Sequence, residues 1–218
     1  MKTFIIIVFK LTVFINISQS FNLASFGAKV NDSSHQTALI NGAAFKKGII
    51  AANSSLTDRT LVIEADHVYT MLPPGLLSRL INVTIELNGR INAWNGNESL
   101  WPNNGETLLT FEKTQGLVIK GNGIIDGFGY SWWENVWITG KDSRPNLIEI
   151  STLKDTLIDG IQLFNSPRYH LNFRDALNLT VQNVVIHVDI NSNLSIADLL
   201  PIFPLNTDGS HLFKIFFS

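Results

Sequence analysis

The sequence contains no cysteine among its 218 residues. No disulfide, thiol nucleophile or thiolate metal site can therefore form. Charged residues are also scarce, at 16% of the chain, and they nearly cancel to a formal net charge of -2. No run of lysine or arginine and no basic amphipathic stretch occurs. This composition argues against nucleic acid or an anionic membrane as a partner.

Hydrophobic residues, by contrast, make up 45% of the chain, which is typical of a globular protein with one sizeable core. A long apolar stretch lies in MKTFIIIVFKLTVFINISQS, after a basic start and before small serines. This layout predicts a secretory signal peptide over residues 1–20, cleaved after Ser20, and one domain over residues 21–218. The alternative is an uncleaved membrane anchor, which the interruption at Lys10 and the short length disfavour.

Several asparagines beyond the leader are followed, two positions later, by serine or threonine. These triplets begin at Asn31, Asn53, Asn82, Asn97, Asn178 and Asn193. Each is a potential N-glycosylation acceptor, and with the signal peptide they predict a secreted, extracellular glycoprotein. A secreted chain without cysteine must gain its stability from backbone pairing and packing instead of covalent cross-links.

Three stretches in the middle of the chain can be aligned with one another. They are LTFEKTQGLVIKGNGII from Leu109, IEISTLKDTLIDGIQLF from Ile148 and LNFRDALNLTVQNVVIH from Leu171. In each stretch, short runs of alternating apolar residues are separated by polar corners. Equivalent positions are held by Phe111, Ile150 and Phe173, by Ile119, Ile158 and Val181, and, in a fainter copy, by Ile85.

Short β-branched strands that recur about every two dozen residues indicate the coils of a solenoid. We predict an all-β fold, a right-handed parallel β-helix whose coils pair strand on strand and bury columns of aliphatic side chains. The competing architecture is an antiparallel sandwich, but the hairpin dipeptides of its turns are missing. The 39-residue gap between Leu109 and Ile148 then holds a loop, FGYSWWENVWITGKDSRPN, inserted at one corner.

A helical pattern appears only near the start, in DSSHQTALINGAAFKKGIIAAN. Polar residues suited to capping precede a run rich in alanine and isoleucine. We predict a short helix there, which covers the open end of the first coil and hides its unpaired strand edges.

Five fragments, FNLASFGAK, GNGIIDGFGYSWW, RPNLIEI, LFNSPRYHL and PLNTDG, occur in this order between Phe21 and Gly209. In order and approximate spacing they resemble glycoside hydrolase family 28, the polygalacturonases and related pectin hydrolases. The resemblance implies a secreted, monomeric parallel β-helix that hydrolyses α-1,4-linked galacturonan, the polysaccharide of pectin, with inversion and without a metal or other cofactor. Inverting hydrolysis needs an acid that protonates the leaving oxygen and a carboxylate that activates water on the other face.

The resemblance implies that Asp208 of NTDG is one of two water-activating carboxylates and that Asn206 lines the same floor. Taken alone, NTDG is also a sequence favoured in tight turns. His170 of SPRYH is expected among the substrate-binding residues. The alternative for His170 and for Tyr169 is a histidine and an aromatic residue that pack within a strand.

The inserted loop contains three tryptophans that could stack on sugar rings, Trp132, Trp133 and Trp137. The interpretation we favour is that the GYSWW stretch packs the loop against its coil. Arg144 is expected to hold the same loop in place.

After NTDG the sequence departs from the family pattern. The family carries two adjacent aspartates, a Gly-His-Gly stretch and an Arg-X-Lys stretch, and none of them occurs in SHLFKIFFS. We therefore expect an N-terminal part of such a domain, incomplete and inactive alone. Two other functions stay open, a non-catalytic β-helix that binds pectin-like polysaccharide and a β-helix lyase. A lyase would need calcium-binding acid clusters, and the sequence shows no dense one.

Overall fold

The computed structural model describes residues 20–189 and 210–216, of which Asn104 and residues 210–216 are described by their backbone alone. The first group of strands is β1 (Phe21–Asn22), β2 (Thr60–Ile63), β4 (Leu77–Ser78), β5 (Thr84–Leu87), β7 (Leu109–Gln115), β8 (Val118–Gly121), β10 (Ile148–Asp159), β12 (Leu171–Gln182) and β14 (Ser210–Phe216). The second group is β3 (Val68–Met71), β6 (Arg90–Ala93), β9 (Ile124–Asp126), β11 (Gln162–Phe164) and β13 (Val185–His187).

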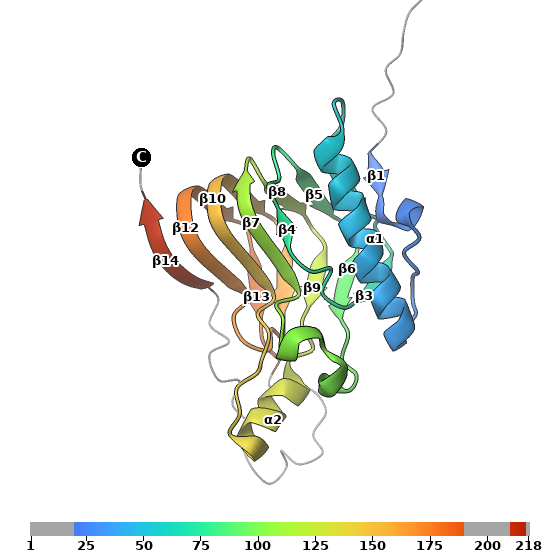
Figure 1. Cartoon of the computed structure of the whole chain (residues 1–218), viewed down its shortest axis with the longest axis vertical. Coiled ribbons are helices and arrows are strands. Elements are labelled where there is room, and N and C mark those ends of the chain that lie inside the picture. Colours follow the sequence, from blue (N-terminus) through green and yellow to red (C-terminus); the bar gives the residue numbers. More distant parts are fainter. Residues whose placement is uncertain (1–19, 190–209, 217–218) are drawn as a thin grey trace, which may run out of the picture.

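These strands form two parallel sheets that the chain visits in turn. The first sheet has the order β1-β2-β5-β8-β10-β12-β14, with β4 and β7 beside it, and the second has the order β13-β11-β9-β6-β3. Every pairing between the described strands is parallel. Successive coils therefore stack side by side (Figure 1), which confirms the parallel β-helix and contradicts the antiparallel sandwich.

The inner columns have the register that the aligned repeats predict. Ile150 pairs with Phe111 and Phe173, and Ile158 pairs with Ile119 and Val181. Ile85 of the fainter copy pairs with Ile119. All of these side chains are buried except Val181, which is 41% exposed. The register of Val181 is as predicted, but β14 pairs with β12 only from Leu171 to Leu177, so no described strand covers Val181.

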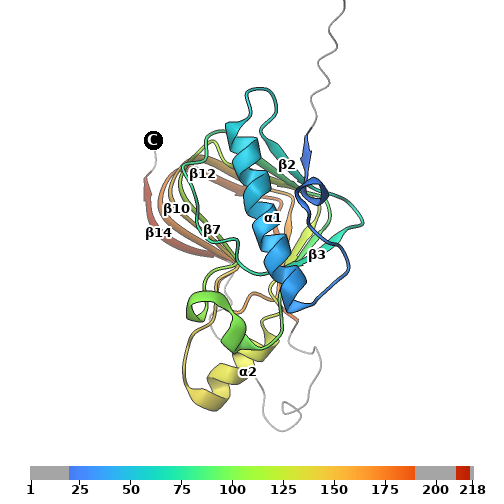
Figure 2. The same cartoon turned by 45° about the vertical axis from the view of Figure 1, so that its right-hand side comes forward.

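The predicted N-terminal helix is present as α1 (His35–Ser54). It begins where the Ser34 side chain accepts a hydrogen bond from the backbone N–H of Thr37. The buried Asn41 amide donates to the backbone carbonyls of Lys29 and Thr70, and so ties the helix to β3. The helix lies across one end of the stacked coils (Figure 2), which confirms its capping role.

The expectation that helix occurs only near the start is wrong. The inserted loop contains a second helix, α2 (Tyr130–Thr139), which ends where Gly140 adopts a left-handed conformation with φ of 68°. Three short 3-10 turns are also present, η1 (Leu23–Phe26), η2 (Glu98–Leu100) and η3 (Pro102–Asn104). Within the described ranges, no helix is long and apolar enough to cross a membrane.

Candidate functional site

Two insertions emerge at the same corner of the solenoid. Residues 94–108 connect β6 to β7, and residues 127–147 connect β9 to β10. In both cases the chain is passing from the second sheet to the first, so the insertions lie beside the ends at which the first-sheet strands begin (Figure 1). Loops that gather at one corner of a solenoid form the wall of a groove.

The two insertions are packed together by Trp101 against Trp132 and by the half-buried carboxylate of Glu98, and Trp133 ties the second insertion to the next coil. The Trp101 ring meets the Trp132 ring edge-on at 5.7 Å between centroids. The Trp133 indole N–H donates to the Pro167 carbonyl at 2.9 Å. The Asn135 amide donates to Glu98 at 2.6 Å, while burial raises the pKa of the Glu98 carboxyl. Trp132 and Trp133 thus pack the loop as predicted.

Trp137, in contrast, is 51% exposed on α2. It is therefore the one tryptophan of the inserted loop that presents much of its ring to solvent. Stacking of this ring on a sugar is the alternative that we did not favour, and nothing in the structure tests it.

Arg144 holds the second insertion to the following coil. Its buried guanidinium donates two hydrogen bonds to the Asp142 carboxylate, from Nε at 2.9 Å and Nη2 at 3.1 Å, and one from Nη1 to the Pro167 carbonyl at 3.3 Å. The hydrogen bonds from Arg144 lower the pKa of Asp142, although partial burial opposes them. The predicted loop-fixing role of Arg144 is confirmed.

Replacing Arg144 with alanine should lower the free energy of unfolding by about 2 kcal/mol, because hydrogen bonds to charged groups are lost and the Pro167 carbonyl loses a donor. Since the pKa of Asp142 is lowered on folding, the contribution of this pair is present above the ordinary aspartate pKa and disappears as the pH falls through the lowered value. Urea unfolding of both proteins from pH 7 to pH 3 measures this, and a difference that does not shrink in acid would contradict it.

His170 lies inside the turn that precedes β12. The ring is completely buried, and its Nε2 accepts a hydrogen bond from the Ser166 backbone N–H at 3.2 Å. The Ser166 hydroxyl in turn donates to the Tyr169 carbonyl at 2.8 Å. The structure therefore buries His170, as the packing alternative expects, although the residue lies in a turn and not within a strand. Its assignment to substrate binding stays a prediction, and in this structure the ring has no exposed surface for a sugar.

Asp208 and Asn206 lie outside the described residues, so their assignments also stay predictions. The described chain resumes at Ser210, which pairs with Leu171 at the start of β12. Asp208 precedes Ser210 by two residues in the sequence.

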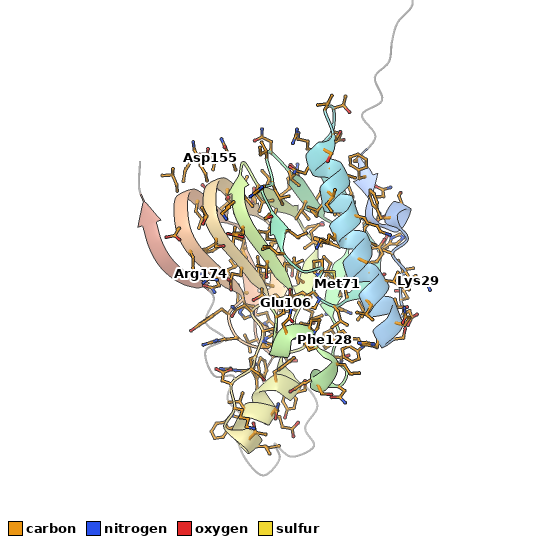
Figure 3. All side chains as sticks on the ribbon, in the orientation of Figure 1. Lys29, Met71, Glu106, Phe128, Asp155 and Arg174 are labelled. Carbon is orange, nitrogen blue, oxygen red and sulfur yellow. The ribbon has the colours of Figure 1, made fainter. Side chains whose placement is uncertain are left out.

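A shallow groove of about 410 Å³ crosses the outer face of the first sheet. Its walls and floor are formed by Leu76, Thr110, Glu112, Glu149, Ser151, Thr152, Arg174 and Asp175. Most of these residues sit at the outward positions of β7, β10 and β12, which alternate with the buried column positions. Figure 3 labels Arg174 on this face. The groove thus runs across neighbouring coils.

Glu149 is the centre of a polar network at this groove. Its carboxylate accepts hydrogen bonds from the Asn146 amide at 3.2 Å and the Asn172 amide at 3.1 Å, and it forms an ion pair with Arg174. We did not predict this network. The sequence contains one signal for this network. Glu149 and Asn172 each occupy the second position of an aligned repeat, and residues at equivalent positions are paired in adjacent strands. Among the described residues, no cluster of three potential metal ligands occurs.

Stacked parallel coils with a polar groove across one sheet define a solenoid protein, a class whose repeats form extended surfaces along the stack. The chain belongs to glycosyl hydrolases family 28, whose family model matches residues 55–215. It is 28% identical to the exopolygalacturonase rpg15 of Rhizopus delemar over 195 residues, 88% of this chain and 46% of that protein. It is 30% identical to a polygalacturonase of Cryptomeria japonica over 137 residues, 60% of this chain and 24% of that protein.

Solved structures show the same fold. The polygalacturonase from Erwinia carotovora ssp. carotovora aligns with a TM-score of 0.62 at 20% identity, over 94% of this chain and 56% of that one. This similarity supports the right-handed parallel β-helix. The chain spans from about a quarter to just under half of the length of the first curated relatives it matches, at 24%, 46% and 34%.

Proposed function

We propose that this chain is part of a pectin-degrading glycosidase that hydrolyses α-1,4-galacturonan by an inverting acid and base mechanism. The observation that supports this most is the family match across residues 55–215, an interval that includes both the groove and Asp208. Relatives named as polygalacturonases and an exopolygalacturonase add to it. We further propose that the protein acts outside the cell after removal of residues 1–20.

In this proposal the outer groove binds the polysaccharide and Asp208 helps to activate water. Parallel strands hold outward side chains about 4.8 Å apart, so several coils can contact successive parts of one extended sugar chain. An inverting enzyme needs a carboxylic acid and a carboxylate far enough apart to admit a water molecule. Asp208 is followed in the sequence by no further aspartate or glutamate.

We therefore propose that the polypeptide of residues 1–218 binds galacturonan but does not cleave it. The second candidate function, a non-catalytic polysaccharide-binding β-helix, is favoured by the same observation, because the described groove contains hydroxyl and carboxyl side chains but no second acid follows Asp208. The two candidates agree on the ligand and differ on the chemistry.

Electrophoresis through gels that contain pectin tests the shared part of this proposal. Pectin should retard the 218-residue chain, whereas starch at the same concentration should not. Ser151→Phe, which fills the groove floor, should abolish the retardation, while Thr180→Phe adds the same bulk to an exposed site on β12 outside the groove and should preserve it. Equal migration in pectin and in a plain gel would contradict the proposal.

A further inference from the structure

The groove contains more negative than positive side chains, and its one lining cation has a carboxylate partner. Glu112, Glu149 and Asp175 contribute three carboxylates, whereas Arg174 is the one cation among the lining residues of the described chain. Arg174 pairs with Glu149. Lys113, the next residue after Glu112, pairs with the Glu112 carboxylate at 2.9 Å. An incoming carboxylate would therefore compete for both cations and would face an excess of negative charge.

The pairing of Arg174 with Glu149 is well supported. The Glu149 side chain is only 14% exposed, and two amide donors, Asn146 and Asn172, fix its orientation. If Arg174 turned to an ionised ligand, Glu149 would lose its counter-ion while its own side chain stays largely buried. Removing one partner from such a pair is unfavourable, because the remaining charge is poorly solvated. Arg174 is therefore a poor receptor for a galacturonate carboxylate.

The remaining lining groups suit an uncharged sugar. Thr110, Ser151 and Thr152 provide hydroxyls that can both donate and accept hydrogen bonds. Leu76 is 48% exposed at the same groove and offers an apolar surface. An ester methyl group can contact such a surface, whereas a carboxylate there would lose hydration without a compensating partner.

We propose that this groove selects methyl-esterified galacturonate units over ionised ones, with the Glu149–Arg174 pair as the determinant of that choice. The proposal rests on the proposed function, because it takes galacturonan as the ligand. To the proposed function it adds the chemical form of galacturonate, the methyl ester, that binds at the coils containing β7, β10 and β12. Ionised galacturonate is disfavoured there by the excess of carboxylates and by the engagement of Arg174.

The experiment compares two galacturonan oligosaccharides of equal length, one fully methyl-esterified and one fully de-esterified, by titration calorimetry with the 218-residue chain. The esterified oligosaccharide should bind at least fivefold more tightly at low salt. The ratio should shrink in 0.5 M NaCl, where the Debye length falls to about 4 Å and charge repulsion is screened.

Glu149→Gln keeps a hydrogen-bond acceptor and removes the charge, which releases Arg174. It should raise the affinity for the de-esterified oligosaccharide several-fold and leave that for the ester nearly unchanged. Asp159→Asn is the matched control, because Asp159 lies on the same strand outside the groove, where it accepts hydrogen bonds from Gln182 and Asn183. This control removes the same charge and should leave the ratio unchanged.

Equal or tighter binding of the de-esterified oligosaccharide by the native chain would overturn this inference and leave the proposed function standing. A ratio that Glu149→Gln does not change would overturn it as well. Binding of neither oligosaccharide would overturn both. If thermal unfolding shows that Glu149→Gln does not fold, Arg174→Gln is the variant to measure. Removal of the cation should widen the preference for the esterified oligosaccharide. A narrower preference would overturn the inference.

Discussion

Replacing Ile150 with aspartate should leave the chain unable to fold. Ile150 is completely buried, with Phe111 and Phe173 as its neighbours in the adjacent coils. A carboxylate there would have no hydrogen-bond donor or counter-ion, and burying it costs several kcal/mol even if it takes up a proton. Domains are stable by only about 5–15 kcal/mol, so this one change removes most or all of the stability. Circular dichroism during heating measures the loss.

Two further substitutions serve as controls for this result. Ile150→Val removes one methylene and should cost about 1 kcal/mol. Lys154→Asp places the same carboxylate at an exposed position of the same strand and should change stability by about 0.5 kcal/mol or less. An Ile150→Asp protein that melts within a few degrees of the native one would show that the column is not the core of the solenoid.

The sequence was sufficient to predict the columns because the coils repeat one local pattern. Each inward side chain of a coil packs against the side chains at the same position in the coils on either side, so equivalent positions hold similar apolar residues. Ile119, Ile158 and Val181 could therefore be aligned from the sequence, and the structure pairs them. Polar corners between the runs marked where the chain turns. Burial was harder to predict, since the exposure of Val181 depends on how far β14 extends along β12.

The helix α2 could not be predicted because its stability comes from tertiary packing. Its sequence, YSWWENVWIT, is rich in aromatic and β-branched residues, which have low intrinsic helix propensity. The Trp132 contact with Trp101 and the Trp133 hydrogen bond to Pro167 connect it to distant parts of the chain. Contacts of this kind override local preference.

The residues of the candidate site could be predicted from the sequence only where they belong to a recognisable motif. The pairing of Glu149 with Arg174 joins residues 25 apart, and each looks like an ordinary outward-facing polar residue in its own strand. His170 is buried in a turn, where its ring accepts a hydrogen bond from the Ser166 backbone. No local sequence pattern predicts this contact. Electrostatic pairing across coils therefore had to come from the structure.

The polypeptide of residues 1–218 should release no reducing ends from galacturonan. A positioned proton-transfer group is commonly worth about 10²–10⁴ in rate, and inverting hydrolysis needs one on each face of the sugar. Asp208 can supply one carboxylate at most, and no acid follows it. Glu149 is not a substitute acid, because three donors hold its carboxylate in the groove. Without a leaving-group acid and a second base, hydrolysis should stay below detection.

The central proposal is that the polypeptide of residues 1–218 binds galacturonan without cleaving it. The most direct test measures reducing-end release from polygalacturonate and from methyl-esterified pectin by the purified 218-residue chain and by its Asp208→Asn variant, after binding to each polysaccharide has been shown. The account predicts that the native chain binds without releasing reducing ends above the buffer blank. Release by the native chain that Asp208→Asn abolishes would contradict it.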